Sequence, residues 1–579
     1  MVLIEKKATS AFLIFIAFIA LGAYWSSFSN AFTHFDDQIQ ITENQDIVKM
    51  NWDKLKTIFS STYVGMYQPV STLIYGLLIG FLGIKPAVFH VFSFLLHLLN
   101  GWLLFLLLKQ LIKKELYIIP LVGLFVLHPM QVESVSWASA TSNIIFTTFY
   151  LSAILSFLKN PKRTFDPSTF SWFIIACLSK ATAISLPVVL LAYLVVIKKK
   201  SWITSFVQLL PYFLISVLIG TITILSRESA EHLTNLSLSY SFVERGLIFC
   251  YTIVFYPLQY VFPLELSTFY SFPNKVNGTF SWIYYAAPFI LAGIAFLVYR
   301  FRKNQLVLFG ALFYIITIGP VLQLIPVGSQ VVTDRYVYLS GIGILIALSP
   351  LLSLIKQPKA LLIASVTCFL GLAFYAQHRT TVWQSDETIW ADVLEKDEFV
   401  AQAWNNKGIT AAKEGKVADA ERYYTRAIQL NPQYADPYTN RGNIYAAQGK
   451  SEAALKDFNM AIKLKPNHAD ALFNRANEFI KIGDFNTALE DLNASIAIKP
   501  GTDALTNRGL IYIQTQKWEL ALADLNASLE INPRNTQAYY LRALVKYQTI
   551  GATAGCADFQ EAANLGDENA KQALIQYCR

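Results

Sequence analysis

The chain has 579 residues, of which 54% are hydrophobic, 14% aromatic and 15% charged, and its mean hydropathy is +0.40. This composition excludes an ordinary soluble enzyme. The formal net charge is +8, and almost all of the basic excess lies before residue 400, between apolar segments. That distribution favours membrane topology signals and argues against a nucleic-acid partner.

Apolar segments recur along the chain as far as about residue 380. A hydrophobic core of about 20 residues crosses a bilayer. The chain carries about eleven candidate segments, several of them short, at 9–29, 87–108, 116–129, 139–158, 168–180, 183–197, 203–225, 283–299, 305–325, 337–355 and 359–377. We therefore predict a polytopic membrane domain over residues 1–380.

The first segment resembles a signal peptide, because Lys6 and Lys7 precede a short apolar run. No small-residue cleavage site stands out before Asp36, and many segments follow, so we expect an uncleaved first helix. Later Lys and Arg residues gather on alternate loops, on the same side as Lys6 and Lys7. Because such residues accumulate in the cytoplasm, an odd number of spans places Asp36 and the C-terminal half on the opposite side.

Two further apolar segments do not fit as ordinary spans. Prolines bound the segment 70–84 and interrupt the segment 243–265. If either segment crossed the membrane once, the later loops would change sides, and the Lys-rich and Arg-rich loops would no longer all lie in the cytoplasm. We therefore expect both to be interfacial or re-entrant on the outer side.

The second half of the chain repeats itself. Asn-Lys-Gly at 406–408 returns as Asn-Arg-Gly at 440–442 and 507–509, and prolines recur at the same offset. The period is 34 residues with one step of 33, which is typical of tetratricopeptide (TPR) repeats, each a pair of antiparallel helices. We predict five repeats and a capping helix over residues 400–579, with a connecting half repeat over 381–399. The predicted fold class is all-α: a polytopic helical bundle followed by a soluble TPR solenoid.

Repeat arrays of this kind present a concave binding surface for peptides. The candidate groove residues are Asn440, Arg441, Asn474, Arg475, Asn507 and Arg508. The alternative is that these side chains bond within and between repeats. We expect no catalytic chemistry in this half.

Five cysteines are present. Cys177, Cys250 and Cys368 fall in apolar segments and are expected to be inert core residues. Cys556 and Cys578 fall in the last repeat and its cap, on the side where oxidation is permitted. They are a candidate disulfide, although sequence alone does not show that their Cα atoms are close enough.

Polar residues gather where the membrane segments reach the outer surface. Asp36 and Asp37 follow the first segment directly. The other candidates for binding a donor phosphate or sugar are His90, His97, His128, Glu133, Lys180, Asp334, Arg335 and Tyr336. Any one of these side chains can lie at a membrane interface at a small cost in free energy, so a single one does not imply a function. Together they indicate a site.

Such a set fits transfer of a sugar from a lipid phosphate. A carboxylate beside the bilayer can accept the proton of an acceptor hydroxyl, while Arg335 and Lys180 hold a phosphate leaving group. A polyprenyl tail would lie between spans, and attack opposite the phosphate would invert the anomeric centre. One catalytic carboxylate is then sufficient, and the paired acids permit a divalent metal without requiring one.

At these residues the chain resembles the transmembrane-and-TPR-containing O-mannosyltransferases and their bacterial relatives. The motifs are Asp36-Asp37, Pro69 to Leu73, Phe89-His90, Leu96-His97, Leu127 to Pro129, Glu133 to Val135, Ser179-Lys180 and Asp334 to Leu339, all ahead of the repeats. The resemblance implies a GT-C glycosyltransferase fold, a polyprenyl-phosphate donor, usually of mannose, and transfer to a protein Ser or Thr on the non-cytoplasmic side. It also implies that the catalytic acid is Asp36 or Asp37.

Two positions depart from the family pattern. Gln68 stands in place of an arginine, and Ala181 in place of a glutamate. Either change could remove a donor contact, so the donor sugar is left open. Short loops and the absence of an obvious organelle signal favour a bacterial inner-membrane protein with periplasmic repeats.

Two other classes of function remain open. The membrane half could be an inactive anchor for an envelope TPR scaffold. It could instead be a lipid-linked sugar transporter, although transporters place charges near the membrane midplane on broken helices. Here the charges gather at one surface, so we rank the transferase first, the scaffold second and the transporter third.

Overall fold

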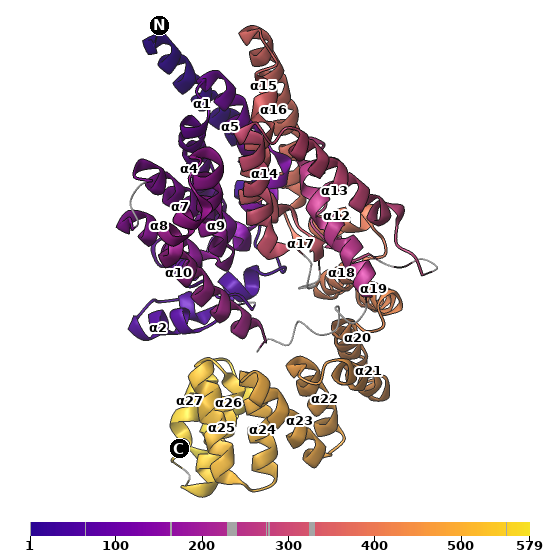
Figure 1. The fold of residues 1–579 in the computed structure, drawn as a ribbon. Helices are drawn as coiled ribbons and strands as arrows, with labels where there is room; N and C mark the ends of the chain where they lie inside the picture. The colour runs from indigo at the N-terminus through magenta and orange to yellow at the C-terminus, as the bar shows by residue number, and fades with distance from the viewer. Residues whose placement is uncertain are drawn as a thin grey trace. The chain divides into compact units, whose positions relative to one another are not determined.

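The computed structural model describes residues 2–63, 65–161, 165–228, 240–273, 275, 278–322, 330–551 and 553–578. The chain forms two compact units, Met1–Lys396 and Asp397–Arg579 (Figure 1). Helices dominate both, and the described residues hold one sheet of two short antiparallel strands, β1 (Tyr270–Ser271) and β2 (Gln330–Val332). The predicted all-α class, with apolar helices followed by TPR repeats, is confirmed.

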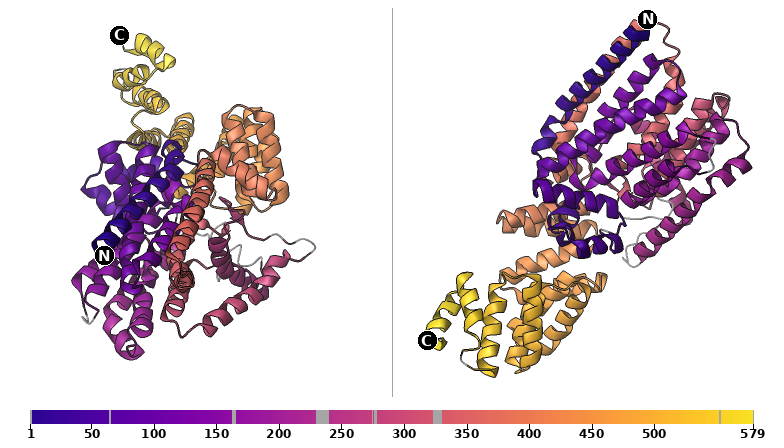
Figure 2. Two further views of the ribbon diagram at one scale, coloured as in Figure 1. Left: turned by 90° about the horizontal axis from the view of Figure 1, so that it is seen from above. Right: turned by 90° about the vertical axis from the view of Figure 1, so that its left-hand side faces the viewer.

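The first unit is a bundle of apolar helices. Its helices are α1 (Val2–Tyr24), α2 (Trp52–Ser60), α3 (Pro69–Leu82), α4 (Pro86–Leu111), α5 (Ile118–Leu127), α6 (Val132–Ser136), α7 (Thr141–Lys159), α8 (Pro167–Ser179), α9 (Leu186–Ala192), α10 (Trp202–Glu228), α12 (Phe242–Val261), α13 (Trp282–Arg300), α14 (Gln305–Ile318), α15 (Val337–Leu352), α16 (Pro358–Val382) and α17 (Asp386–Lys396). Figure 2 shows α1 lying beside α16, although the two are at opposite ends of this unit's sequence.

Seven helices in the described part are long and apolar enough to cross a membrane, or eight if one bent pair is a single span. That pair joins Glu115–Leu127 to Pro129–Ser136 with a bend of 48°. The remaining predicted segments form shorter apolar helices. The predicted re-entrant segment 70–84 also does, as the helix Pro69–Leu82. The other predicted re-entrant segment is one continuous helix, α12, which contains Pro257 and ends before Phe262. Pro257 removes one backbone hydrogen bond from α12, but the helix continues past it to Val261.

Close helix packing in the bundle depends on glycine at one crossing. A Cβ atom on Gly310 of α14 would lie 2.3 Å from the backbone nitrogen of Ala347, and one on Gly343 of α15 would lie 2.4 Å from that of Tyr314. The two backbones therefore touch where both helices carry glycine. Any larger residue there would separate α14 from α15.

The segment 381–399, predicted as a connecting half repeat, is divided differently in the structure. Residues up to Val382 continue α16, and α17 packs within the first unit, where Ile389, Trp390 and Val393 are buried. The helical spacing of these apolar residues resembles that of a repeat helix, but their partners lie in the membrane unit. The second unit begins at Asp397.

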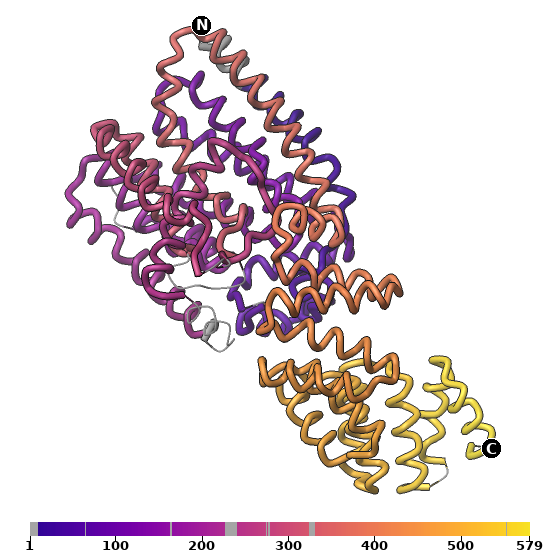
Figure 3. The backbone as a smooth tube through the Cα atoms, turned by 90° about the vertical axis from the view of Figure 1, so that its right-hand side faces the viewer, coloured from indigo at the N-terminus to yellow at the C-terminus, as the bar shows by residue number. Residues whose placement is uncertain are grey.

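The second unit is a stack of helix pairs (Figure 3). Its helices are α18 (Ala401–Lys413), α19 (Val417–Leu430), α20 (Ala435–Ala447), α21 (Ser451–Leu464), α22 (Ala469–Lys481), α23 (Phe485–Ile498), α24 (Thr502–Gln514), α25 (Trp518–Ile531), α26 (Thr536–Thr549), α27 (Cys556–Asn564) and α28 (Glu568–Tyr577). Gly415, Gly449 and Gly483 turn the chain between the helices of a pair with φ of 74°, 72° and 79°. The fourth repeat makes the same turn with Gln516, at φ 57°, a conformation that favours glycine.

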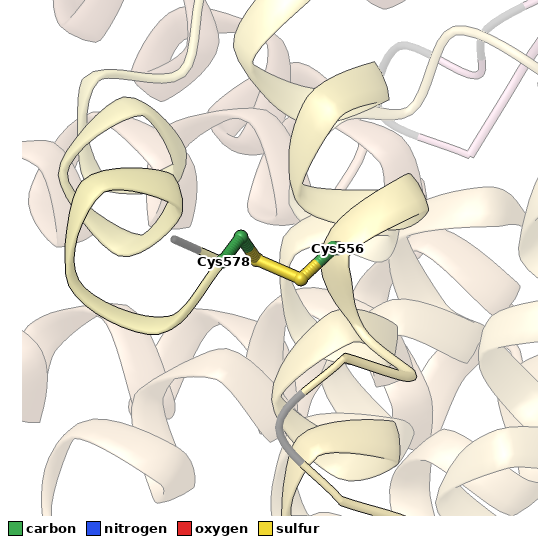
Figure 4. The surroundings of a disulfide bond; sticks show 2 residues. All are labelled: Cys556 and Cys578. Carbon is green, nitrogen blue, oxygen red and sulfur yellow. A yellow bond between two sulfur atoms is a disulfide. The ribbon is translucent and has the colours of Figure 1, made fainter.

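Cys556 and Cys578 form a disulfide between the start of α27 and the end of α28, with Cα atoms 5.7 Å apart (Figure 4). This pairing ties the last helix to the last repeat. Of the other cysteines, Cys177 is buried, as predicted, and Cys250 is partly exposed. Cys368 is not a core residue, because it lies on the exposed face of α16.

Candidate functional site

Asp36 and Asp37 are neighbours with opposite surroundings. Asp37 is 1% exposed, and its carboxylate accepts four hydrogen bonds. Oδ2 accepts from the backbone N–H (2.9 Å) and hydroxyl (3.1 Å) of Thr33. Oδ1 accepts from the backbone N–H (2.8 Å) and hydroxyl (2.5 Å) of Ser139. Asp37 therefore holds the loop that follows α1 against the helical turn that precedes α7.

Asp36 is partly exposed, and its carboxylate accepts no hydrogen bond from any residue that the structure describes. Burial raises the pKa of Asp36 to about 6; Arg335 lowers it, Asp37 raises it and Lys180 lowers it. A general base works best when its pKa lies near the operating pH. Of the two acids, Asp36 alone is therefore free to accept a proton from a bound molecule.

Arg335 is held in place by Glu133. The Arg335 guanidinium forms an ion pair with Glu133 Oε1, and the Arg335 backbone N–H donates to Glu133 Oε2 at 2.9 Å. Glu133 is 3% exposed. The guanidinium also lies over the rings of Trp137, at 5.1 Å, and Tyr336, at 5.3 Å. These contacts fix a cation on the same side of the unit as Asp36.

Asp334 precedes this arginine in the chain, but its carboxylate has other partners. Its buried carboxylate accepts a hydrogen bond of 3.0 Å from the Tyr270 hydroxyl. The buried Arg379 interacts with it electrostatically. The sequence places Asp334 among the candidate donor contacts, and the structure places its carboxylate inside the protein.

Lys180 is the second cation near Asp36. It follows the last residue of α8, and its ammonium group donates to Asn143 Oδ1 at 2.6 Å. Asn143, on α7, was not predicted as a site residue. The one signal in the sequence was its position, six residues after Trp137.

The two departures from the family pattern lie close to this part of the site. The Ser71 hydroxyl, on the first turn of α3, donates to the Ser179 carbonyl at 2.9 Å, beside Lys180. Gln68, just before α3, is buried and donates from Nε2 to Gln40 Oε1 at 3.1 Å. Its own Oε1 is buried without a hydrogen-bond partner among the described residues. Ala181 supplies no polar group at all.

Two of the predicted histidines are structural. The His97 ring bonds with the Tyr338 hydroxyl (2.8 Å) and the Val126 carbonyl (3.0 Å). The His128 ring bonds with the Tyr260 carbonyl (3.0 Å) and stacks on the Tyr260 ring at 4.1 Å. Both rings are fully buried. Their bonds join helices of the bundle to one another.

His90 has a different environment. It is 1% exposed and lies near the backbone of Asn30, but neither ring nitrogen has a well-formed hydrogen bond among the described residues. Phe32, in the loop that follows α1, packs on Phe89, the residue before His90. The site that the structure assembles thus contains Asp36, Arg335 and Lys180, supported by Glu133 and Asp37.

The three predicted groove arginines and Arg542, which was not predicted as a groove residue, make a regular ladder within the repeats. Each arginine binds both oxygens of an aspartate 16 residues later, at 2.7–2.9 Å: Arg441 with Asp457, Arg475 with Asp491, Arg508 with Asp524, and Arg542 with Asp558. The Nη1 atom of each then donates to the preceding repeat, at Thr425, Asn459, Asn493 and Asn526. We call this set the arginine ladder.

Two of the three predicted groove asparagines form hydrogen bonds between repeats. The side chains of Asn440 and Asn507 donate to Asn405 (3.0 Å) and Asn477 (2.8 Å). Asn474 is partly exposed and makes no such bond within the described part of the chain. These contacts favour the internal role for most of the set, and peptide binding by the groove stays a prediction.

A divalent metal also stays a prediction. No group of three or more His, Cys, Asp or Glu side chains that could hold an ion occurs among the described residues. Asp37 could turn toward a metal only by giving up hydrogen bonds to Thr33 and Ser139. Asp36 is the one acid of the pair with an open carboxylate.

Comparison with known families assigns the repeats. The tetratricopeptide repeat family matches residues 401–434, 435–468 and 469–502, and the TPR repeat matches 509–549. Among solved structures, the crystal structure of YrrB, described as a TPR protein with an unusual peptide-binding site, covers 33% of this chain and 98% of its own. Its sequence identity is 18% and its TM-score is 0.29.

Curated relatives extend over the membrane unit as well. The chain is 22% identical over 474 residues to the protein O-mannosyl-transferase TMTC3 of Mus musculus, covering 72% of this chain and 51% of that protein. It is 23% identical over 444 residues to the protein O-mannosyl-transferase F38B6.6 of Caenorhabditis elegans, covering 73% of this chain and 63% of that protein. The chain thus spans about half the length of the mouse relative.

Proposed function

We propose that this chain, a TMTC-like relative of the protein O-mannosyltransferases with C-terminal TPR repeats, is itself a membrane glycosyltransferase of the inverting GT-C type. It moves a sugar, with mannose favoured, from a polyprenyl phosphate to the hydroxyl of a protein Ser or Thr. The apolar helices of the first unit hold the enzyme in the membrane. The repeats recruit the acceptor protein or a partner of it.

The observation that carries this proposal is the open carboxylate of Asp36 beside two fixed cations. Asp36 has a pKa of about 6, so it is largely ionised at neutral pH and able to accept a proton. Arg335 and Lys180 both act on it electrostatically. An acid flanked by cations in this way matches a reaction in which a hydroxyl loses a proton while a phosphate departs.

In the proposed reaction, Asp36 takes the proton of the acceptor hydroxyl as its oxygen attacks the anomeric carbon. The bond between that carbon and the phosphate oxygen breaks, and the electron pair leaves with the phosphate. Arg335 and Lys180 balance the charge of the departing lipid phosphate, which needs no proton from a general acid. Attack from the face opposite the phosphate inverts the anomeric centre. No step requires a metal.

We place the site and the repeats on the non-cytoplasmic side, in a bacterial inner membrane. The alternating Lys and Arg loops support this sidedness, and so does the Cys556–Cys578 disulfide, because disulfides persist in oxidising compartments. In a bacterial envelope the donor would be an undecaprenyl-phosphate sugar. Thiol labelling in intact cells tests this point. In a variant whose free cysteines Cys177, Cys250 and Cys368 are replaced by alanine, Cys556 and Cys578 are expected to react only after reduction. Labelling of this variant without reduction would argue against a periplasmic location.

The transferase proposal is tested with membranes that carry wild type, Asp36→Asn or Glu43→Gln. Glu43 is an exposed carboxylate in the same loop without a side-chain hydrogen bond to any described residue, so it is the matched control. Labelled sugar from polyprenyl-phosphate-mannose should reach envelope protein with wild type and the control. With Asp36→Asn the rate should fall by about 10² to 10⁴, at equal protein level. Unchanged transfer by Asp36→Asn would remove this acid from the mechanism.

The alternative is a non-catalytic, membrane-anchored TPR scaffold. Gln68 and Ala181 favour it, because neither supplies the charged group that the family pattern has at that place. Failure of wild type to transfer mannose, followed by failure with a panel of other polyprenyl-phosphate sugars, would support the scaffold. Transfer of a different sugar would instead identify the donor.

A further inference from the structure

The outer loop leading to Asp36 runs along the corner between α16 and α17. The Asn30 side chain donates to the Thr380 carbonyl at 3.1 Å. The Ala31 backbone N–H donates to the Gln384 carbonyl, also at 3.1 Å. Contacts therefore tie this loop to a segment about 350 residues later in the chain.

The two residues immediately before Asp36 contact α17 itself. The His34 backbone N–H donates to Asp386 Oδ1 at 2.7 Å, and the His34 imidazole bonds with Asp386 Oδ2. The Phe35 ring stacks on the Trp390 ring, with centroids 5.4 Å apart and planes 24° from parallel. One polar and one aromatic contact thus hold adjacent residues, which restrains both the position and the rotation of the loop.

The helix that makes these contacts is itself anchored. Trp390 is 5% exposed. Asp392 forms ion pairs with Arg379, at 2.7 Å, and with Lys396, and Lys396 also donates to the Leu266 carbonyl at 2.5 Å. Breaking a buried ion pair by removing one partner is costly, so the Arg379–Asp392 pair holds α17 firmly against the end of α16.

The same corner also supports the other side of the site. Arg379 is buried and acts electrostatically on Asp334, the residue before Arg335. Residues 379–396 therefore contact the loop of the proposed catalytic acid through Asp386 and Trp390, and through Arg379 they act on the neighbour of Arg335. Asp37 and Ser139 hold the far end of the loop, so Asp36 lies between two attachments.

We propose that α17 is a working part of the transferase, in which Asp386 and Trp390 are positioning residues that hold the Asp36 carboxylate against the acceptor hydroxyl. This inference rests on the proposed function. Neither residue needs to touch the donor or the acceptor. The helix that precedes the repeats in the chain is then a part of the site and not a passive linker.

The kinetic test compares Asp386→Asn and Trp390→Ala with Glu387→Gln. Glu387 is the neighbouring carboxylate on α17, is exposed, and has no side-chain hydrogen bond to a described residue. We expect kcat to fall by about tenfold or more in the first two, since small misplacements of reacting groups are costly. KM for the lipid donor should hardly change, because Arg335 and Lys180 are untouched. Trp390→Phe keeps a ring to stack on Phe35 and should restore most of the rate.

Hydrogen–deuterium exchange provides a readout that does not depend on activity. Exchange in residues 31–42 should accelerate in Asp386→Asn and Trp390→Ala, and exchange in α7 should not. Unchanged exchange there, or an equal loss of kcat in Glu387→Gln, would overturn the inference. If wild type transfers no sugar from any donor while exchange still accelerates, the attachment of the loop stands and the catalytic role fails together with the proposed function.

Discussion

Ser139 donates both its backbone N–H and its hydroxyl to Oδ1 of Asp37, across 102 residues of sequence. These bonds give Asp37 a different role from Asp36, its neighbour in the chain. Asp37 has every lone pair direction occupied, while Asp36 keeps its carboxylate open. The pair therefore divides into one acid that builds the loop and one that is available for chemistry.

The first prediction concerns the structural acid. Asp37→Asn replaces an acceptor oxygen by an amide group that donates, so at least one buried donor of Thr33 or Ser139 loses its partner. An unsatisfied buried polar group costs about 1–3 kcal/mol. The melting temperature of the purified protein should fall, and Ser139→Ala should lower it less, because the Ser139 backbone N–H remains. A melting temperature unchanged by Asp37→Asn would contradict the structural role.

The second prediction is the pH dependence of transfer. The base must be ionised, and burial raises the pKa of Asp36 to about 6, so kcat/KM should fall below about pH 6 and level off above it. Lys180 lowers this pKa, so Lys180→Met should move the acidic limb to higher pH. Initial rates between pH 4.5 and 8 measure both effects. A limb that stays in place in Lys180→Met would show that another group controls it.

Sequence reasoning identified Asp36 and Asp37 but could not choose between them. The choice depends on Thr33, which is close in sequence, and on Ser139, which is not, and no local pattern links residues so far apart. The role of α17 was missed for a related reason. The spacing of Ile389, Trp390 and Val393 suits a repeat helix equally well, and only the fold shows what these side chains contact.

The repeats were predictable because each unit repeats the same local interactions at a fixed period. The role of their arginines was not predictable in the same way. Arg475 and Asp491 are on different helices of one pair, and a polar residue on the surface of a solenoid suits either a ligand or a neighbour. Their pairing became evident only from the distance between them.

The third prediction follows from the same raised pKa of Asp36. Since the folded-state pKa lies above the ordinary value of 3.8, the folded protein binds this proton more tightly than the unfolded chain does. The stabilisation of the folded state by protonated Asp36 is therefore complete below about pH 3.8 and is lost as the pH rises to about 6. Above that pH the ionised carboxylate costs the folded state an amount on the order of 1–3 kcal/mol.

Asp36→Asn should accordingly be more stable than wild type at pH 7.5 while it is inactive. The gain in melting temperature should shrink as the pH is lowered toward 4. Glu43→Gln should show no such gain, because that carboxylate is exposed. Lower stability of Asp36→Asn at pH 7.5 would contradict the raised pKa.

The fourth prediction concerns the Arg335–Glu133 ion pair, whose side chains are 16% and 3% exposed. Glu133→Gln removes the charge that orients Arg335, and breaking a buried pair costs about 3–5 kcal/mol. Both stability and kcat should fall. Arg335→Lys keeps the charge and the backbone N–H bond to Glu133 Oε2, but it replaces the planar guanidinium that lies over the Trp137 and Tyr336 rings. Its kcat should therefore fall with a smaller loss of stability. Equal kcat in wild type and Arg335→Lys would exclude a geometric role for the guanidinium.

The fifth prediction tests the arginine ladder. Asp491→Asn breaks the two-point contact with Arg475, whose side chain also donates to Asn459 of the preceding repeat. We expect the local free energy of unfolding to fall by about 1–3 kcal/mol, seen as faster hydrogen exchange in α22, α23 and the adjoining helix α21.

The first repeat provides the control for this prediction. At the ladder positions it has Lys407 and Tyr423, and the ammonium lies over the Tyr423 ring at 5.1 Å instead of forming an ion pair. Exposed cation–ring contacts contribute only about 0.5–1 kcal/mol, so Lys407→Met should change hydrogen exchange little. If Lys407→Met and Asp491→Asn loosen their repeats equally, the bidentate pairs are not what holds the ladder together. If Asp491→Asn alone does so, the groove arginines are structural, and peptide recognition must depend on other residues of the array.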